Sequence, residues 1–235
     1  PFVEGEGKIL LFNPLGQSRH DVVEFRCDPA LHINANKKPI IILTDAAGTR
    51  YPGQLRTYAD GRMTCLFTPT LEPFSWSRYT LQLEKSSSPS YSDSSLESDT
   101  QAQNALLGVH LDRRETEYIL ENRYYRVTVA HTGRIESIFQ KSLDKELLKQ
   151  PLAYEFQKEK PKHYPAWNMD WKDRKRPPFE RLETADTVTV LETGPVRVML
   201  QITTTYQDST FIKEIALSAD SPRVDFTERI IWRER

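Results

Sequence analysis

The segment from His163 to Trp171 combines aromatic rings with polar side chains of the kind that bind carbohydrate. Sugars present apolar C–H faces, on which aromatic rings stack, and a rim of hydroxyl groups, which form hydrogen bonds with amides and carboxylates. Tyr and Trp also pin loops and fill domain interfaces, and composition alone favours that packing role. The candidates for substrate binding or for a domain interface are Tyr164, Trp167, Asn168, Asp170 and Trp171.

The acidic residues do not single out a catalytic pair. Glycoside hydrolysis commonly uses two carboxylates that flank the scissile bond, but the chain has 33 acidic residues, so a chance pair is easy to find. Asp170 and Asp173 lie three residues apart, and we interpret them as solvated loop carboxylates. An autonomous glycosidase built on Asp170 and a second carboxylate is the interpretation that we favour least, and we assign no catalytic residue in this chain.

Other reactive residue types also lack a recognisable site. None of the five histidines has a close metal-ligand spacing, and no Gly-x-Ser-x-Gly elbow or Gly-rich phosphate loop is present. We therefore expect no metal and no cofactor in this chain. Cys27 and Cys65 can form one disulfide at most, and we interpret Cys65, in a strand-like segment, as a buried thiol. This cysteine usage fits the cell interior, so we predict a cytoplasmic location.

Composition excludes two classes of partner. The formal net charge is −1, from 32 basic and 33 acidic residues, which provides no basic surface for nucleic acid. No apolar run approaches the roughly 20 residues that span a bilayer. Hydrophobic residues make up 38% of the chain, enough for a folded core. We expect a folded protein whose partners are neither nucleic acids nor membranes.

Short strand-like runs separated by turn signals occupy residues 8–84. Asp60-Gly61 is a hairpin signal between Gln54–Tyr58 and Met63–Phe67. Apolar and polar residues alternate over Tyr79–Glu84, as in a strand with one buried face. Six or seven such strands, at a spacing of roughly ten residues, predict a small β-sandwich over residues 1–85.

A serine-rich stretch separates this sandwich from a second β-rich region. Eight serines fall within residues 86–98, with too few apolar groups to offset the chain entropy of folding, so we predict a linker over residues 86–114. Long strand-like runs at Val196–Tyr206 and Val224–Trp232 favour a large sheet within residues 115–235. The chain begins at Pro1 and ends just past such a run, so we expect both ends to be cuts through a longer protein.

Several short motifs follow one another along the chain. They are Leu11–Leu15 with Asp21–Glu24, Leu120–Val127, Gly133–Ile138 with Lys141 and Asp144–Leu148, Tyr164–Asp170, Thr193–Arg197, Ser221–Phe226 and Trp232–Arg235. Each motif alone is common, but their order over residues 8–235 is specific and resembles glycoside hydrolase family 38, the retaining α-mannosidases. The serine-rich segment has no counterpart in that family, and Gln17 stands where the family often has Trp.

The resemblance implies an all-β fold, with a small Ig-like β-sandwich followed by the N-terminal part of a larger antiparallel supersandwich, galactose-mutarotase-like and truncated. Family members carry the nucleophilic Asp and the zinc ligands in an N-terminal catalytic domain, and none of those motifs is present here. The resemblance therefore implies zinc in the parent enzyme but none in this chain. It also implies three partners, which are the missing catalytic domain, the remaining β-strands and an α-mannoside.

Two functions remain open. The first is a non-catalytic β-domain portion of an α-mannosidase, which braces the catalytic domain and lends the loop at residues 160–176 to the substrate site. The alternative is a stand-alone carbohydrate-binding or assembly module that uses the same loop as a stacking platform. A truncated sheet would also leave unpaired edges and an uncovered apolar face, so we expect self-association through those edges.

Overall fold

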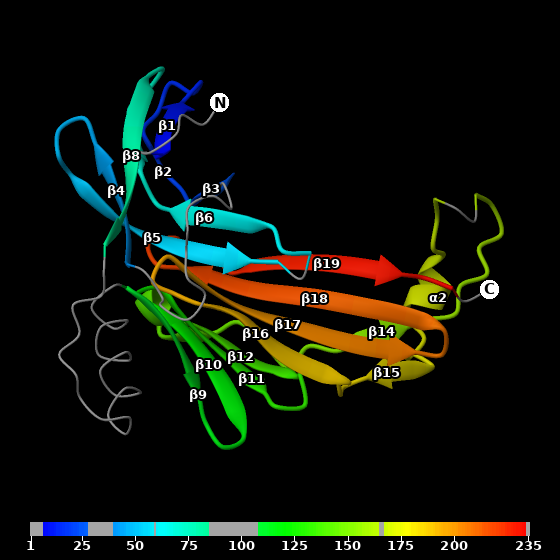
Figure 1. Cartoon of the computed structure of the whole chain (residues 1–235). Helices are drawn as coiled ribbons and strands as arrows, with labels where there is room; N and C mark the ends of the chain where they lie inside the picture. Colours follow the sequence, from blue (N-terminus) through cyan, green and yellow to red (C-terminus); the bar gives the residue numbers. More distant parts are fainter. Residues whose placement is uncertain (1–6, 28–39, 59, 85–107, 165–166, 234–235) are drawn as a thin grey trace.

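The computed structural model describes residues 7–27, 40–58, 60–84, 108–164 and 167–233, which form two β-rich regions (Figure 1). Nearly all regular elements in these residues are strands, which confirms the all-β prediction. Most of the predicted linker over 86–114 lies outside the described residues, but its C-terminal end was placed wrongly. Strand β9 (Val109–Arg113) pairs with β10 (Glu117–Asn122). Val109 is fully buried in the core of the second region, so this segment belongs to the fold and not to a linker.

The first region is a curled antiparallel sheet in the order β1-β8-β4-β5-β6-β3, with the short pair β2–β7 beside it. Its curl encloses a core in which the rings of Tyr51, Phe67 and Tyr79 meet edge to face. The strands are β1 (Gly7–Phe12), β2 (Arg19–His20), β3 (Val23–Arg26), β4 (Ile40–Asp45), β5 (Arg50–Thr57), β6 (Met63–Phe67), β7 (Thr70–Leu71) and β8 (Trp76–Glu84).

The hairpin predicted at Asp60-Gly61 joins β5 to β6, as expected. Gly61 adopts a φ of 81°, which a residue without a Cβ tolerates best. The Tyr58 amide donates to the Arg62 carbonyl at 2.8 Å, and the Asp60 side chain accepts from the Arg62 amide at 3.1 Å. The prediction for Cys65 is also confirmed, because Cys27 and Cys65 are both buried free thiols.

The second region is a sandwich of two antiparallel sheets. One follows the order β13-β12-β11-β10-β9 and the other β16-β17-β18-β19, with a two-stranded ribbon β14–β15 at one end. Its remaining elements are β11 (Tyr125–Ala130), β12 (Ile135–Gln140), a 3₁₀ turn (Lys141–Leu143), β13 (Lys145–Glu146), β14 (Tyr154–Phe156), α2 (Trp171–Arg174), β15 (Glu180–Leu182), β16 (Thr187–Thr193), β17 (Arg197–Tyr206), β18 (Ser209–Ser218) and β19 (Asp225–Ile231).

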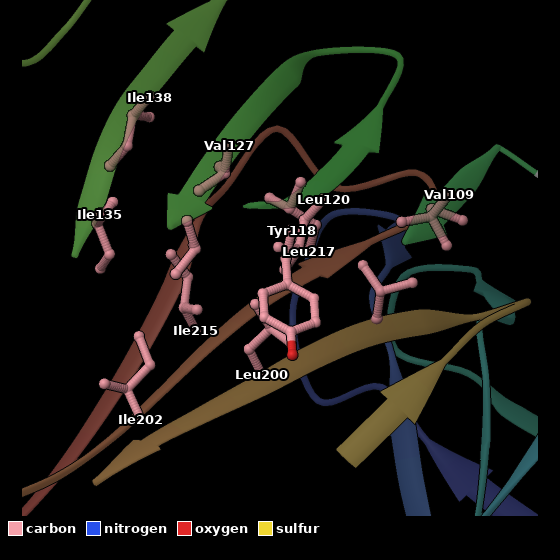
Figure 2. Packing of buried hydrophobic residues seen from close by; sticks show 13 residues of the cluster. Val109, Tyr118, Leu120, Val127, Ile135, Ile138, Leu200, Ile202, Ile215 and Leu217 are labelled. Carbon is pink, nitrogen blue, oxygen red and sulfur yellow. The ribbon is translucent and has the colours of Figure 1, made fainter. Parts of the chain in front are cut away.

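Alternating apolar residues from both sheets form the core of this sandwich (Figure 2). Leu200 and Ile202 of β17 project toward Val127 and Ile135 of the opposite sheet, and these four side chains are almost fully buried. Burial of each such side chain stabilises the fold by roughly 1.5–3 kcal/mol. Gly133 precedes β12 with a φ of 82°, and an added Cβ there would lie 2.5 Å from the Ala185 side chain.

Two buried asparagines fasten turns in the two regions. Asn13 donates to the carbonyls of Gln17 and Glu72, both at 2.9 Å. Asn122 donates to the Ser218 carbonyl at 2.8 Å and accepts from the amide of Tyr125 at 2.8 Å. Because a buried amide left without partners is destabilising, both residues specify the local chain path.

Candidate functional site

The predicted aromatic segment lies within a long excursion of the chain between β14 and β15. The base of this excursion packs on an aromatic cluster, in which Phe156 stacks on Tyr206 with ring centroids 4.5 Å apart and also contacts Phe179. Phe211 and Trp232 complete the cluster. Figure 1 places α2 and this aromatic loop, residues 157–179, at the far end of β17 and β18 from the first region.

The aromatic candidates are exposed to solvent. The exposed fractions are 75% for Tyr164, 90% for Trp167 and 66% for Trp171. The backbone of Trp167 is held by a hydrogen bond in which its amide donates to the Tyr164 carbonyl at 2.9 Å. One side of the Trp171 ring carries Lys175, whose Nζ lies 5.2 Å from the ring centroid. Among the described residues no ring contact joins these three, so the loop presents separate aromatic groups rather than one assembled platform.

The two polar candidates do lie together. Asn168 donates to Asp170 Oδ1 at 2.9 Å, and Asp170 Oδ2 accepts from the Lys162 amide at 3.4 Å. The Nζ of Lys172 is 3.6 Å from the same carboxylate. Asp170 is therefore engaged in holding the turn, and its side chain is 26% exposed.

Asp173 does not fit the interpretation of a solvated carboxylate. It is 1% exposed, its Oδ2 accepts from the Lys160 amide at 3.0 Å, and Arg176 forms an ion pair with it at 3.4 Å. The sequence spacing did not reveal this role because Lys160 lies thirteen residues away. Asp173 joins the two arms of the aromatic loop, whereas Asp170 remains near its surface.

A second polar cluster, which we call the junction, joins the two regions. Gln54 of β5 accepts from the amides of Val196 and Arg197 at 2.9 and 2.8 Å and donates to Glu192 at 3.1 Å. Arg197 forms two hydrogen bonds with the Glu192 carboxylate, at 2.7 and 2.8 Å. Arg56, 3.2 Å from Glu192, supplies a second positive charge.

The electrostatics of the junction balance burial against pairing. Burial opposes the charge of Arg197, but the hydrogen bonds and attraction of Glu192 outweigh it, so the pKa of Arg197 is raised. Burial also opposes the charge of Glu24, yet hydrogen bonds from Tyr58, Thr64 and Arg197 hold the pKa of Glu24 below its usual value. Loss of one partner of such a buried ion pair strongly destabilises the fold, because the other charge is left buried without compensation.

Sequence reasoning missed the junction. Arg197 belongs to a motif that was noticed, but Gln54 lies 143 residues from it and no local pattern marks that residue. Gln54 and Glu192 each lie in a strand of mixed apolar and polar residues, β5 and β16, and a polar side chain within a predicted strand was the signal available. Buried polar groups need partners, so such residues predict an interface even when the partner is unknown.

Within the described part of the chain, no group of three His, Cys, Asp or Glu side chains is placed to hold a metal ion. The described residues thus provide no ligand set that fits zinc. No helix among them has the length and apolar character needed to cross a bilayer.

Comparison with known proteins gives one family. Residues 120–235, which include the second sandwich from the end of β10 onward, match the family model for the glycosyl hydrolases family 38 C-terminal domain. No curated protein matches the chain.

Proposed function

We propose that this chain is the non-catalytic β-domain portion of an α-mannosidase, and the match of residues 120–235 to the glycosyl hydrolases family 38 C-terminal domain supports this proposal. In this role it braces the catalytic domain of the parent enzyme, which hydrolyses α-mannosides. Zinc would belong to that catalytic domain. We further propose a cytoplasmic location, which the two buried free thiols support.

The junction is the observation that carries this proposal. It buries Glu192 and Gln54 between the two regions and pairs their polar atoms across it. A substrate site needs accessible polar groups, whereas these groups hold the two regions in one orientation. Two regions fixed in this way are suited to supporting a third domain.

The aromatic loop supports a finer part of the proposal. Its rings are exposed and lie far from the junction, so they are available to a neighbouring domain or to a sugar. We propose that Tyr164, Trp167, Asn168, Asp170 and Trp171 reach the mouth of the substrate site in the parent enzyme. The alternative, a stand-alone carbohydrate-binding module, is favoured by the same exposure of Trp167.

The test is hydrolysis of an aryl α-mannoside by the purified chain, with and without added zinc. We expect no turnover, because no catalytic pair is assigned to this chain. Turnover that survives repurification and falls in Asp170→Asn would place an active site in this chain and refute the proposal. Saturable mannose binding that is lost in Trp167→Ala would favour the module.

Strand β19 supports a proposal about partners. It lies at the edge of its sheet, and its apolar residues Phe226, Ile230 and Ile231 are exposed. An edge strand with apolar side chains is a template for pairing with another strand. We propose that β19 pairs with a further strand of the parent protein, and in the isolated chain with a second copy.

Sedimentation velocity over a range of concentrations tests this partner. We expect reversible dimers of the wild-type chain and a shift toward monomer in Ile230→Lys, because a charge on an edge strand disfavours pairing. Lys172→Gln, in the aromatic loop, serves as a surface control. A wild-type chain that stays monomeric at every concentration would refute the proposal.

A further inference from the structure

A cleft of about 560 Å³ lies between the β5–β6 hairpin and the outer face of the sheet β16-β17-β18-β19. This volume falls within the range of roughly 300–1,000 Å³ that is typical of small-molecule sites, which often form where two domains meet. The aromatic loop contributes no residue to the cleft, because the lining comes from the hairpin and from the four strands. The cleft is therefore separate from the predicted sugar-binding loop.

The hairpin wall of the cleft is held in place by paired charges. The Arg56 guanidinium lies 4.4 Å from the centroid of the Tyr58 ring and forms ion pairs with Glu192 and Glu214. The Arg62 guanidinium lies 4.9 Å from the same centroid and is 2.6 Å from the Asp60 carboxylate. Each charge on this wall has a partner, so the wall does not require an ionic ligand for neutrality.

The sheet floor presents unused donors and acceptors. Gln201 donates to Glu214 Oε1 at 3.2 Å, which leaves the Gln201 carbonyl and Glu214 Oε2 as acceptors. The Thr227 hydroxyl both donates and accepts. Arg229 lines the same floor, and its guanidinium carries only N–H donors.

We propose that this cleft binds a neutral polyhydroxylated ligand, that is, a pyranose sugar. Sugar hydroxyl groups donate and accept at once, which matches a floor that offers both kinds of group side by side. An anion would meet the carboxylates of Glu214 and Asp60, and a cation would meet the guanidinium groups of Arg56 and Arg229. This site rests on the proposed function only for the class of sugar. It adds to that function a saccharide site away from the aromatic loop.

The experiment titrates the purified chain with methyl α-mannoside and with a neutral mannobiose, followed by calorimetry or by backbone amide shifts. We expect saturable binding that is weakened about tenfold in Arg229→Gln and in Thr227→Val, since each removes hydrogen bonds to the ligand. Arg223→Gln is the matched control for loss of an exposed arginine outside the cleft. Arg223→Gln should bind as the wild type does, and Trp167→Ala tests separately whether the loop takes part in the binding.

Three outcomes would overturn the inference. They are the absence of saturable binding of either sugar, binding that Trp167→Ala removes while Arg229→Gln retains it, and tighter binding of inorganic phosphate that Arg229→Gln removes. The last result would make the cleft an anion site. None depends on turnover, so a failure of the cleft and a failure of the non-catalytic role give different results.

Discussion

The junction and the aromatic loop are both rich in polar and aromatic residues, yet the structure uses them in opposite ways. The junction draws Gln54, Glu192 and Arg197 from strands far apart in the sequence and buries them. The loop draws its residues from one short segment and exposes Trp167 almost completely. Aromatic and polar residues that cluster in the sequence therefore lie on an exposed surface here. The polar contacts of the junction cannot be recognised in the sequence, because they form only when the two regions meet.

The comparison is tested most strongly by Arg197→Met. This change leaves the buried Glu192 carboxylate with Arg56 as its remaining cation, and loss of one partner of a buried pair destabilises a fold by roughly 3–5 kcal/mol. We expect the free energy of unfolding in urea to fall by about that amount. Arg114→Met breaks an exposed ion pair instead, and should change stability by at most ~1 kcal/mol. Equal losses of unfolding free energy in the two variants would show that the buried ion pair of the junction contributes no more than an exposed one.

Gln54→Leu should have the next largest effect. It removes the acceptor for the amides of Val196 and Arg197 and leaves them buried at the junction. An unsatisfied buried donor costs about 1–3 kcal/mol, and we expect a loss of this size in urea unfolding. The double variant with Arg197→Met should lose less than the sum of the single losses, because both residues contact Glu192. Strict additivity would mean that the contacts act independently.

A smaller effect should appear as a pH dependence. The folded pKa of Glu24 lies below its usual value of 4.5, so the unfolded state binds more protons near that pH and stability rises with pH there. The contribution of Glu24 is present at neutral pH and is lost as the pH falls from 4.5 through the folded pKa. We expect Glu24→Gln to be less stable than the wild type at pH 7 and to approach it near pH 3. A constant difference would contradict this origin.

The smallest effect should come from Trp167→Ala. Its ring is exposed, and such surface substitutions usually change stability by less than ~0.5 kcal/mol. Phe156→Ala, at the stacked base of the same loop, should cost about 2 kcal/mol. Thermal unfolding of both variants checks this order. If Trp167→Ala lowers stability as much as Phe156→Ala does, the Trp167 ring contributes to packing and is not a free surface group.

The sequence predicted much of the fold, because strand alternation and turn chemistry are local. The hairpin at Asp60-Gly61 was found from two residues. Buried Asn13 and Asn122 lie within the segments that resemble family 38, and both fasten turns. The motifs thus carried information about structure.

The site was harder to predict for the same physical reason. Gln54 and Arg197 meet only after two regions have folded and packed. Asp173 looked like a solvated carboxylate because its partner amide at Lys160 is distant in sequence. The start of β9 was hidden by its proximity to the serine-rich stretch, and only the burial of Val109 reveals it.

The central claim is that the junction makes the two regions one cooperative unit, and native-state hydrogen exchange at rising urea tests it most directly. The wild-type chain should open β4 and β8 of the first region at the same free energy as β17 and β18 of the second. In Arg197→Met the first pair should open earlier than the second. If β4 and β8 already open well before β17 and β18 in the wild type, the regions are independent and the account is wrong.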